Sequence, residues 1–222
     1  MANASFTRDE VILALDVLYF SGDERLNAES KSVVELSELL NRLPIHAESS
    51  RREIFRNPHG VVAQIQKFRR SYAKGLKDIN TGAMFYQIAL EFEGRLDELH
   101  EIAEAIRRNV SAYDDICFGD DTEDDGFPEG SLLGHLHRFI ELRDDGKLAL
   151  ESGCVICQIN PSDVYKGGVN LLTGHLTVPV TKLDAKTRYK ALDYITVCPS
   201  CHAALHRYRP WVGKENCREI LR

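Results

Sequence analysis

The stretch TVCPSCHAALHRYRPW, residues 196–211, sets two cysteines and two histidines close together near the C-terminal end of the sequence. An earlier C-x-x-C, the CVIC at residues 154–157, supplies a second cysteine pair. Each C-x-x-C knuckle turns two thiolates inward, and four thiolates satisfy tetrahedral zinc. The pattern therefore predicts a structural Zn²⁺ ion, against the alternatives of two unrelated knuckles or a redox pair. The four predicted ligands are Cys154, Cys157, Cys198 and Cys201.

The histidines beside the second knuckle predict a further site. His202 and His206 are four residues apart, so a helix that begins at the knuckle carries both imidazoles on one face. Four thiolates already fill the zinc, which leaves these rings for a second metal. Between the knuckles the one histidine is His175, in a β-type run, and it is the candidate third ligand or base. The alternative is that these rings are ordinary surface or core histidines.

The composition fits a globular protein of one large or two small domains. The chain has 222 residues, of which 43% are hydrophobic and 28% charged. It lacks an 18-residue apolar run and a signal-peptide pattern, which leads us to expect a cytoplasmic protein that does not span a membrane. In that reducing compartment, paired C-x-x-C motifs favour metal over disulfides. Cys117 and Cys217 remain and are expected to be ordinary thiols.

The N-terminal part is predicted to be helical. TRDEVILALDVLYF opens with a capping box, Thr7 and Glu10, and SVVELSELLNRLP repeats the helical spacing until Pro44. Asn57 and Pro58 suit the start of a third helix, which would bury Val61, Ile65 and Phe68. Further amphipathic stretches span 93–108 and 131–145.

An acidic stretch divides the chain. Residues 114–130 carry like charges and little that can be buried, which is typical of a linker. We therefore expect a helical DNA-recognition domain at 1–113, this linker, and a second domain at 131–222 that mixes short β-type runs with the Cys/His helix. The expected fold class is α+β.

Basic residues gather in one segment although the net charge is −6. Residues 51–77 are strongly basic, and DNA responds to such a local patch rather than to the total charge. The helix from Asn57 would lie on or in a groove, with phosphates bound by basic side chains and a base edge read by Gln64 or His59. The alternative is a solvated charged face. The candidate DNA-binding residues are Arg56, His59, Gln64, Lys67, Arg69 and Arg70.

Several motifs in the C-terminal third resemble one family. These are CVIC, DVYKGG, GHLTVPV and LDYITVCPSCHAALHRYRPW, preceded by PEGSLLGHLHR. Together they resemble the HNH (ββα-metal) nucleases that carry a four-cysteine zinc site, particularly the McrA-like modification-dependent restriction endonucleases. The N-terminal helical part also looks like a domain found ahead of HNH units. The resemblance implies a zinc-stapled ββα-metal domain after the helical one.

The resemblance also implies a catalytic site with Mg²⁺ or another divalent ion. His175, His202 and His206 match the family's metal ligands, and Asp193 falls where the middle Asn or Asp sits. The family's general base, however, falls on Leu176, which cannot accept a proton. A one-residue bulge after Gly174 would turn His175 into the base; otherwise the unit is an inactive module.

The favoured interpretation is a restriction or defence endonuclease that hydrolyses DNA, modified or not, with structural zinc and a catalytic divalent ion. Cutting both strands with one site per chain would call for a homodimer. The contrasting hypothesis is a catalytically inactive, zinc-containing DNA-binding module. A zinc-ribbon interaction protein that does not bind DNA is a third interpretation, but it leaves the three histidines unexplained.

Overall fold

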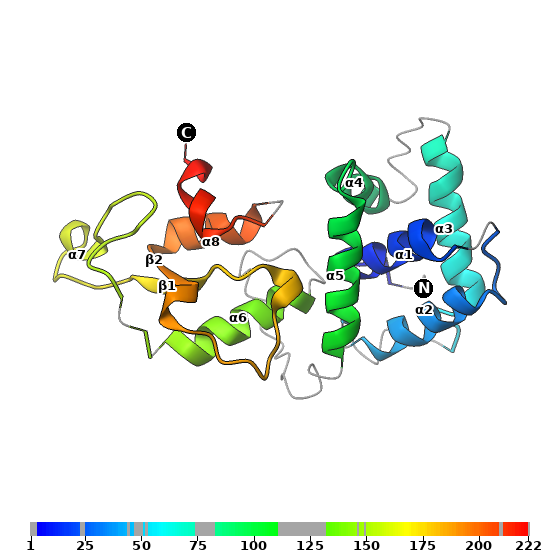
Figure 1. The fold of residues 1–222 in the computed structure, drawn as a ribbon, viewed down its shortest axis with the longest axis horizontal. Helices are drawn as coiled ribbons and strands as arrows, with labels where there is room; N and C mark the ends of the chain where they lie inside the picture. The colour runs from blue at the N-terminus through cyan, green and yellow to red at the C-terminus, as the bar shows by residue number, and fades with distance from the viewer. Residues whose placement is uncertain are drawn as a thin grey trace. The chain divides into compact units, whose positions relative to one another are not determined.

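The computed structural model describes residues 4–22, 25–43, 45–46, 51, 53–73, 83–110, 132–145, 147–148, 150–208 and 211–221. The chain divides into two compact units, Met1–Asp115 with Glu129–Leu132, and Ile116–Pro128 with Leu133–Arg222. The fold is α+β, with one two-stranded antiparallel sheet among the described residues (Figure 1). The predicted linker at 114–130 and Cys117 lie outside the described residues. Within the described parts, helices fall short of the length and apolarity that crossing a membrane requires.

The first unit is built around its first helix. Residues 9 to 17 of that helix are all buried, and every other helix of the unit packs against it. A helix surrounded in this way is mostly apolar, and its buried acids Glu10 and Asp16 are paired with arginines. The helices are α1 (Arg8–Phe20), α2 (Lys31–Arg42), α3 (Pro58–Ala73), α4 (Ala83–Glu91) and α5 (Leu96–Asn109) (Figure 1).

Local signals predicted four of these helices, α1, α2, α3 and α5. The Thr7 N–H donates to Glu10 Oε2 at 2.8 Å, which is the glutamate half of the predicted capping box. Asn57 Oδ1 accepts from Gly60 N at 2.7 Å at the start of α3, and the predicted core face of α3 is buried. Helix α4 was not predicted, because its short apolar sequence AMFYQIALE offers no polar face to set a helical period.

Arg56 is a correction to the predicted DNA-binding set. Its side chain is 3% exposed, and Nε donates to Glu10 Oε1 at 2.6 Å. Its Nη atoms donate to the carbonyls of Ala4 and Ser5. Burial raises the pKa of Glu10, but hydrogen bonds from His46 and Arg56 outweigh it and lower that pKa. Arg56 therefore neutralises a buried carboxylate and stabilises unit 1, and it is not available to a phosphate.

The second unit contains the small sheet and the helices around it. Strand β1 pairs in regular register with β2, from Thr173 opposite Val197 to Leu176 opposite Tyr194. No residue is inserted, so the bulge considered after Gly174 is wrong. The elements are α6 (Leu132–Asp145), α7 (Pro161–Val164), β1 (Thr173–Leu176), the 3-10 turns η3 (Val180–Lys182) and η4 (Ala191–Asp193), β2 (Tyr194–Val197), α8 (Pro199–Arg207) and η5 (Lys214–Ile220).

Candidate metal centres

The two cysteine knuckles meet because backbone hydrogen bonds hold the first against β2. Val155 N donates to Thr196 O at 3.0 Å. Gln158 adopts a left-handed φ of 62°, which closes the first knuckle through a bond from its N–H to Cys154 O. The second knuckle starts α8, with Cys198 at the N-cap and Pro199 in the first turn. Backbone hydrogen bonds and the start of α8 thus bring the two knuckles to the same place.

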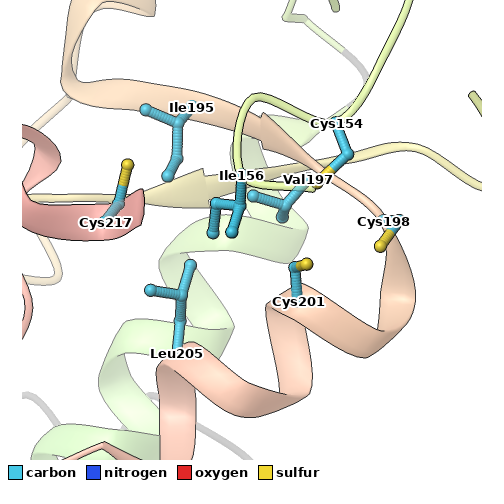
Figure 2. Packing of buried hydrophobic residues seen from close by; sticks show 8 residues of the cluster. All are labelled: Cys154, Ile156, Ile195, Val197, Cys198, Cys201, Leu205 and Cys217. Carbon is cyan, nitrogen blue, oxygen red and sulfur yellow. The ribbon is translucent and has the colours of Figure 1, made fainter. Parts of the chain in front are cut away.

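The four sulfurs fit a zinc ion. The ligand atoms of Cys154, Cys157, Cys198 and Cys201 all lie within 4.8 Å of one another. The Sγ atoms of Cys157 and Cys198 are 3.8 Å apart, which is about the separation of two sulfurs in a tetrahedron with Zn–S bonds of about 2.3 Å. The cluster is capped by apolar residues that exclude water, among them Ile156 and Leu205 (Figure 2).

Electrostatics in the cysteine cluster favour a cation. Burial and the neighbouring thiols raise the pKa of Cys201. For Cys154, burial raises the pKa, but hydrogen bonds from backbone N–H groups outweigh it and bring the pKa to about 7. Backbone donors thus prepare one thiolate, while the crowding of the other thiols is relieved when a divalent cation displaces their protons.

Cys217 belongs to the apolar core of this region but not to the four-cysteine group. It lies in η5 and belongs to the apolar cluster of Figure 2, but it is not one of the four grouped thiols. The neighbouring Arg218 Nε donates to Val155 O at 2.8 Å, which fastens η5 to the first knuckle. Cys217 is thus a packed thiol, as expected from the sequence.

A second cluster forms on the other side of α8. His175 from β1 meets His202 and His206 from α8, with ring centroids 5.3 and 4.9 Å from His175. The Nε2 atoms of His202 and His206 are 2.9 Å apart. All three rings are buried. The structure therefore brings together the three histidines that the sequence singled out.

Two further members of this cluster come from α6 and were missed in the sequence. The Glu141 carboxylate lies between the three rings, with Oε1 at 2.9 Å from His175 Nδ1 and Oε2 at 3.1 Å from His202 Nε2. Oε2 is also 3.3 Å from His206 Nε2, and Oε1 is 3.5 Å from His137 Nδ1. An available signal was the i, i+4 spacing of His137 and Glu141, which puts the two side chains on one face of a predicted helix.

The charge state of the cluster suits a divalent cation. Burial raises the pKa of Glu141, but the surrounding histidines outweigh it and hold that pKa well below its usual range, so the carboxylate stays ionised. Burial lowers the pKa of His175, that of His206 to about 4 and that of His137 to about 3. Neutral imidazoles around a carboxylate are the protonation states that metal binding needs.

Leu176 has a structural role at the position where the family resemblance expects the base. Its side chain is fully buried. Its N–H donates to Glu141 Oε1 at 2.9 Å, and its carbonyl accepts from His137 Nε2 at 2.7 Å. The Leu176 backbone thus orients both α6 residues of the cluster.

Asp193 is placed differently from the expectation. Its Oδ2 accepts from Lys190 N at 2.7 Å, which caps its own short turn, and its carbonyl accepts from Thr177 N. It does not belong to any group of potential metal ligands among the described residues. The carboxylate therefore shapes the loop before β2, and Glu141 is the acid beside the histidines.

A third group of potential ligands lies in unit 1, where an arginine side chain already neutralises its acids. Asp16, His100 and Glu104 lie close together. Arg107 pairs with Asp16 at 2.7 Å and with Glu104 at 2.6 Å. The guanidinium supplies the positive charge that a metal would bring, so this group is an ion-pair network.

The other predicted DNA-binding residues are all exposed on α3. They are His59, Gln64, Lys67, Arg69 and Arg70. Arg69 and Arg70 also line a cavity of about 410 Å³ together with Arg25. Arg25 was not among the predicted DNA-binding residues. The apolar residues that line the cavity are Leu18, Leu26 and Ile65, and none of the described residues that line it is acidic. The surface is thus suited to an anion such as a phosphate.

Comparison of the chain with protein-family models, with curated protein sequences and with solved structures gives no match. Function must therefore be argued from the two clusters and the basic helix themselves.

Proposed function

We propose that this protein is an HNH-type, metal-dependent DNA endonuclease with a role in restriction or defence. The observation that carries the proposal is the convergence of His175, His202 and His206 in a β1–β2–α8 arrangement, directly beside a four-cysteine site. Short strands and a helix that join at a histidine cluster match the unit that the sequence motifs resemble. The four-cysteine site would hold structural zinc, and the histidine cluster a second, catalytic ion.

The chain's own residues divide the work of phosphodiester hydrolysis. A divalent ion bound at the histidine cluster would supply charge stabilisation to the phosphate and its leaving oxygen. His202 is the candidate to accept the proton of the attacking water, because its side chain is 10% exposed against 1% for His175 and 2% for His206. Leu176 keeps its place in the core of unit 2 and needs no bulge.

The basic face of α3 would supply affinity for the DNA backbone. We expect an Arg69→Ala, Arg70→Ala double variant to flatten the plot of log affinity against log salt concentration by about 1.8, since each lost phosphate contact removes about 0.9. The measurement is binding to random duplex DNA by fluorescence anisotropy over a salt series. Lys31→Ala is the control, because Lys31 is an exposed cation that pairs with Glu35. An unchanged slope in the double variant would assign DNA binding to another surface.

Cleavage of plasmid DNA tests the proposal directly. The zinc-loaded chain, with Mg²⁺, Mn²⁺, Co²⁺ or Ni²⁺ added in turn, should nick or linearise modified or unmodified plasmid, and His175→Ala should abolish this. His135→Ala, an exposed histidine of α6, should cleave like the wild type. If no ion supports cleavage by the wild type, the endonuclease proposal fails.

A second candidate function is an inactive, zinc-containing DNA-binding module. The observation that favours it is the burial of the histidine cluster together with the leucine at position 176. This candidate predicts DNA binding of normal salt dependence without cleavage under any ion. The plasmid experiment run beside the anisotropy series therefore separates the two functions.

A further inference from the structure

We infer that α6 supplies half of the second metal site, which is formed by His137, Glu141, His175 and His206, and that this site takes a transition-metal ion. The inference rests on the proposed function only for what the ion does, because the ligand set is argued from the side chains alone. These four residues each offer one donor atom within 4.8 Å of the others, and all four are buried. His202 lies beside the group, with its Nε2 atom 2.9 Å from His206 Nε2 and 3.1 Å from Glu141 Oε2, and it keeps the proposed role of proton acceptor.

The separations between the donor atoms fit coordination of one ion. Donors bound at about 2.1 Å lie roughly 2.9 Å apart at right angles and about 3.4 Å apart in a tetrahedron. The separations from the Glu141 oxygens are 2.9 Å to His175 Nδ1, 3.3 Å to His206 Nε2 and 3.5 Å to His137 Nδ1. All three separations therefore fall close to those of donors that share one ion. His202 Nε2 lies at a similar 3.1 Å, but His202 is not among the four residues whose donor atoms all lie within 4.8 Å of one another.

The tautomer of His137 also supports its role as a metal ligand. A carbonyl can only accept, so His137 Nε2 carries the proton that it donates to Leu176 O. In the neutral ring Nδ1 then carries the lone pair, and this atom faces the ionised Glu141. Metal-binding histidines commonly donate their other ring N–H to a backbone carbonyl in this way. The Nδ1 lone pair of His137 and the Glu141 carboxylate oxygen repel each other, and a cation bound between them would remove this repulsion.

Helix α6 is fixed in place by contacts that need no ion. Arg143 donates to the carbonyls of Ala185 and Thr187 at 2.7 and 2.9 Å. The Tyr194 hydroxyl of β2 donates to Asp144 Oδ2 at 3.0 Å. The two α6 donors are therefore held at β1 and α8 by the folded chain, so the site is pre-formed and replacing one donor leaves the helix anchored.

The donor types select the ion. Three imidazoles and one carboxylate suit Zn²⁺, Co²⁺ or Ni²⁺, whereas Mg²⁺ prefers oxygen ligands and retains several waters. The site thus favours an imidazole-binding first-row ion over the Mg²⁺ that the family resemblance allows. Four protein donors also leave room in a five- or six-coordinate ion for a water or a phosphate oxygen.

The test is the metal content and Co²⁺ spectrum of the full-length chain. The wild type should bind two ions per chain by mass spectrometry of the metals, one at the cysteines and one at the second site. With zinc at the cysteines, added Co²⁺ should give ligand-field bands without thiolate charge transfer. Glu141→Gln and His137→Ala should each weaken Co²⁺ binding about 100-fold or more while the cysteine zinc stays. His135→Ala, on the same helix, should bind like the wild type.

The outcomes separate this inference from the proposed function. A wild type that binds one ion per chain, or variants that bind Co²⁺ like the wild type, would overturn the ligand assignment. Retained zinc at the cysteines shows that unit 2 is folded in each variant, so a loss of Co²⁺ is a loss of ligand. If two ions are bound and the variants lose one, but plasmid is never cut, the site stands and the endonuclease proposal falls.

Discussion

Replacing Cys201 with serine is expected to remove the zinc ion and to unfold the second unit. Cys201 lies in the first turn of α8, where its side chain is buried among the apolar residues of the cluster. Structural zinc contributes about 10–16 kcal/mol in zinc-finger peptides, which exceeds or matches the total stability of about 5–15 kcal/mol of a small domain. Loss of the ion is therefore more than unit 2 can tolerate.

The experiment compares Cys201→Ser with Cys217→Ser, a buried cysteine in the same core that is outside the four-cysteine group. Metal analysis should show zinc lost in the first variant and retained in the second. Near-ultraviolet circular dichroism and limited proteolysis should show unit 2 unfolded in Cys201→Ser alone. A Cys201→Ser chain without zinc that keeps native proteolytic resistance would show that the cysteine site is not structural.

The two predicted metal sites depend on each other in one direction. Helix α8 presents Cys201 and Leu205 to the zinc cluster and His202 and His206 to the histidine cluster. A variant that cannot bind the zinc should therefore bind neither ion. A variant without the Glu141 carboxylate should lose the second ion and keep the zinc. This asymmetry follows from the zinc being needed to fold the helix that carries the other ligands.

How much of the site could be predicted depended on distance along the chain. The four cysteines and the pair His202/His206 were recognisable because short, fixed spacings encode them. Glu141 and His137 were not, since they reach the cluster through the backbone of Leu176, 35 and 39 residues away. Their i, i+4 spacing shows that the two residues are neighbours on one helix, but it does not show that this helix packs against β1 and α8.

The same limit explains why Arg56 was misassigned. Its neighbours in sequence are basic, and a run of cations favours a solvent-facing DNA contact. Its partner Glu10 lies 46 residues earlier and was predicted only as part of the capping box of its helix. Only the fold shows that the two charges are buried together, whereas the exposed face of α3 followed directly from its helical period.

The departure at position 176 also has a structural explanation. Side chains alternate along β1, so His175 and Leu176 point to opposite faces of the strand. A histidine at 176 would be buried away from the three imidazoles and could not serve as the base. Leu176 contributes to the cluster through its backbone. Its N–H orients Glu141 and its carbonyl orients His137. The proposed nuclease reaction would therefore take its proton acceptor from the histidine cluster.

His202→Ala is therefore expected to lower the cleavage rate by about 10²- to 10⁴-fold while both ions remain bound. His206→Ala, one turn further along α8, should lose the second ion and the cleavage together. Single-turnover cleavage rates measured beside metal content distinguish the two residues, and the cysteine zinc confirms folding in each variant. If His202→Ala instead releases the second ion, His202 is a ligand, and His175, the next imidazole beside Glu141, becomes the candidate proton acceptor.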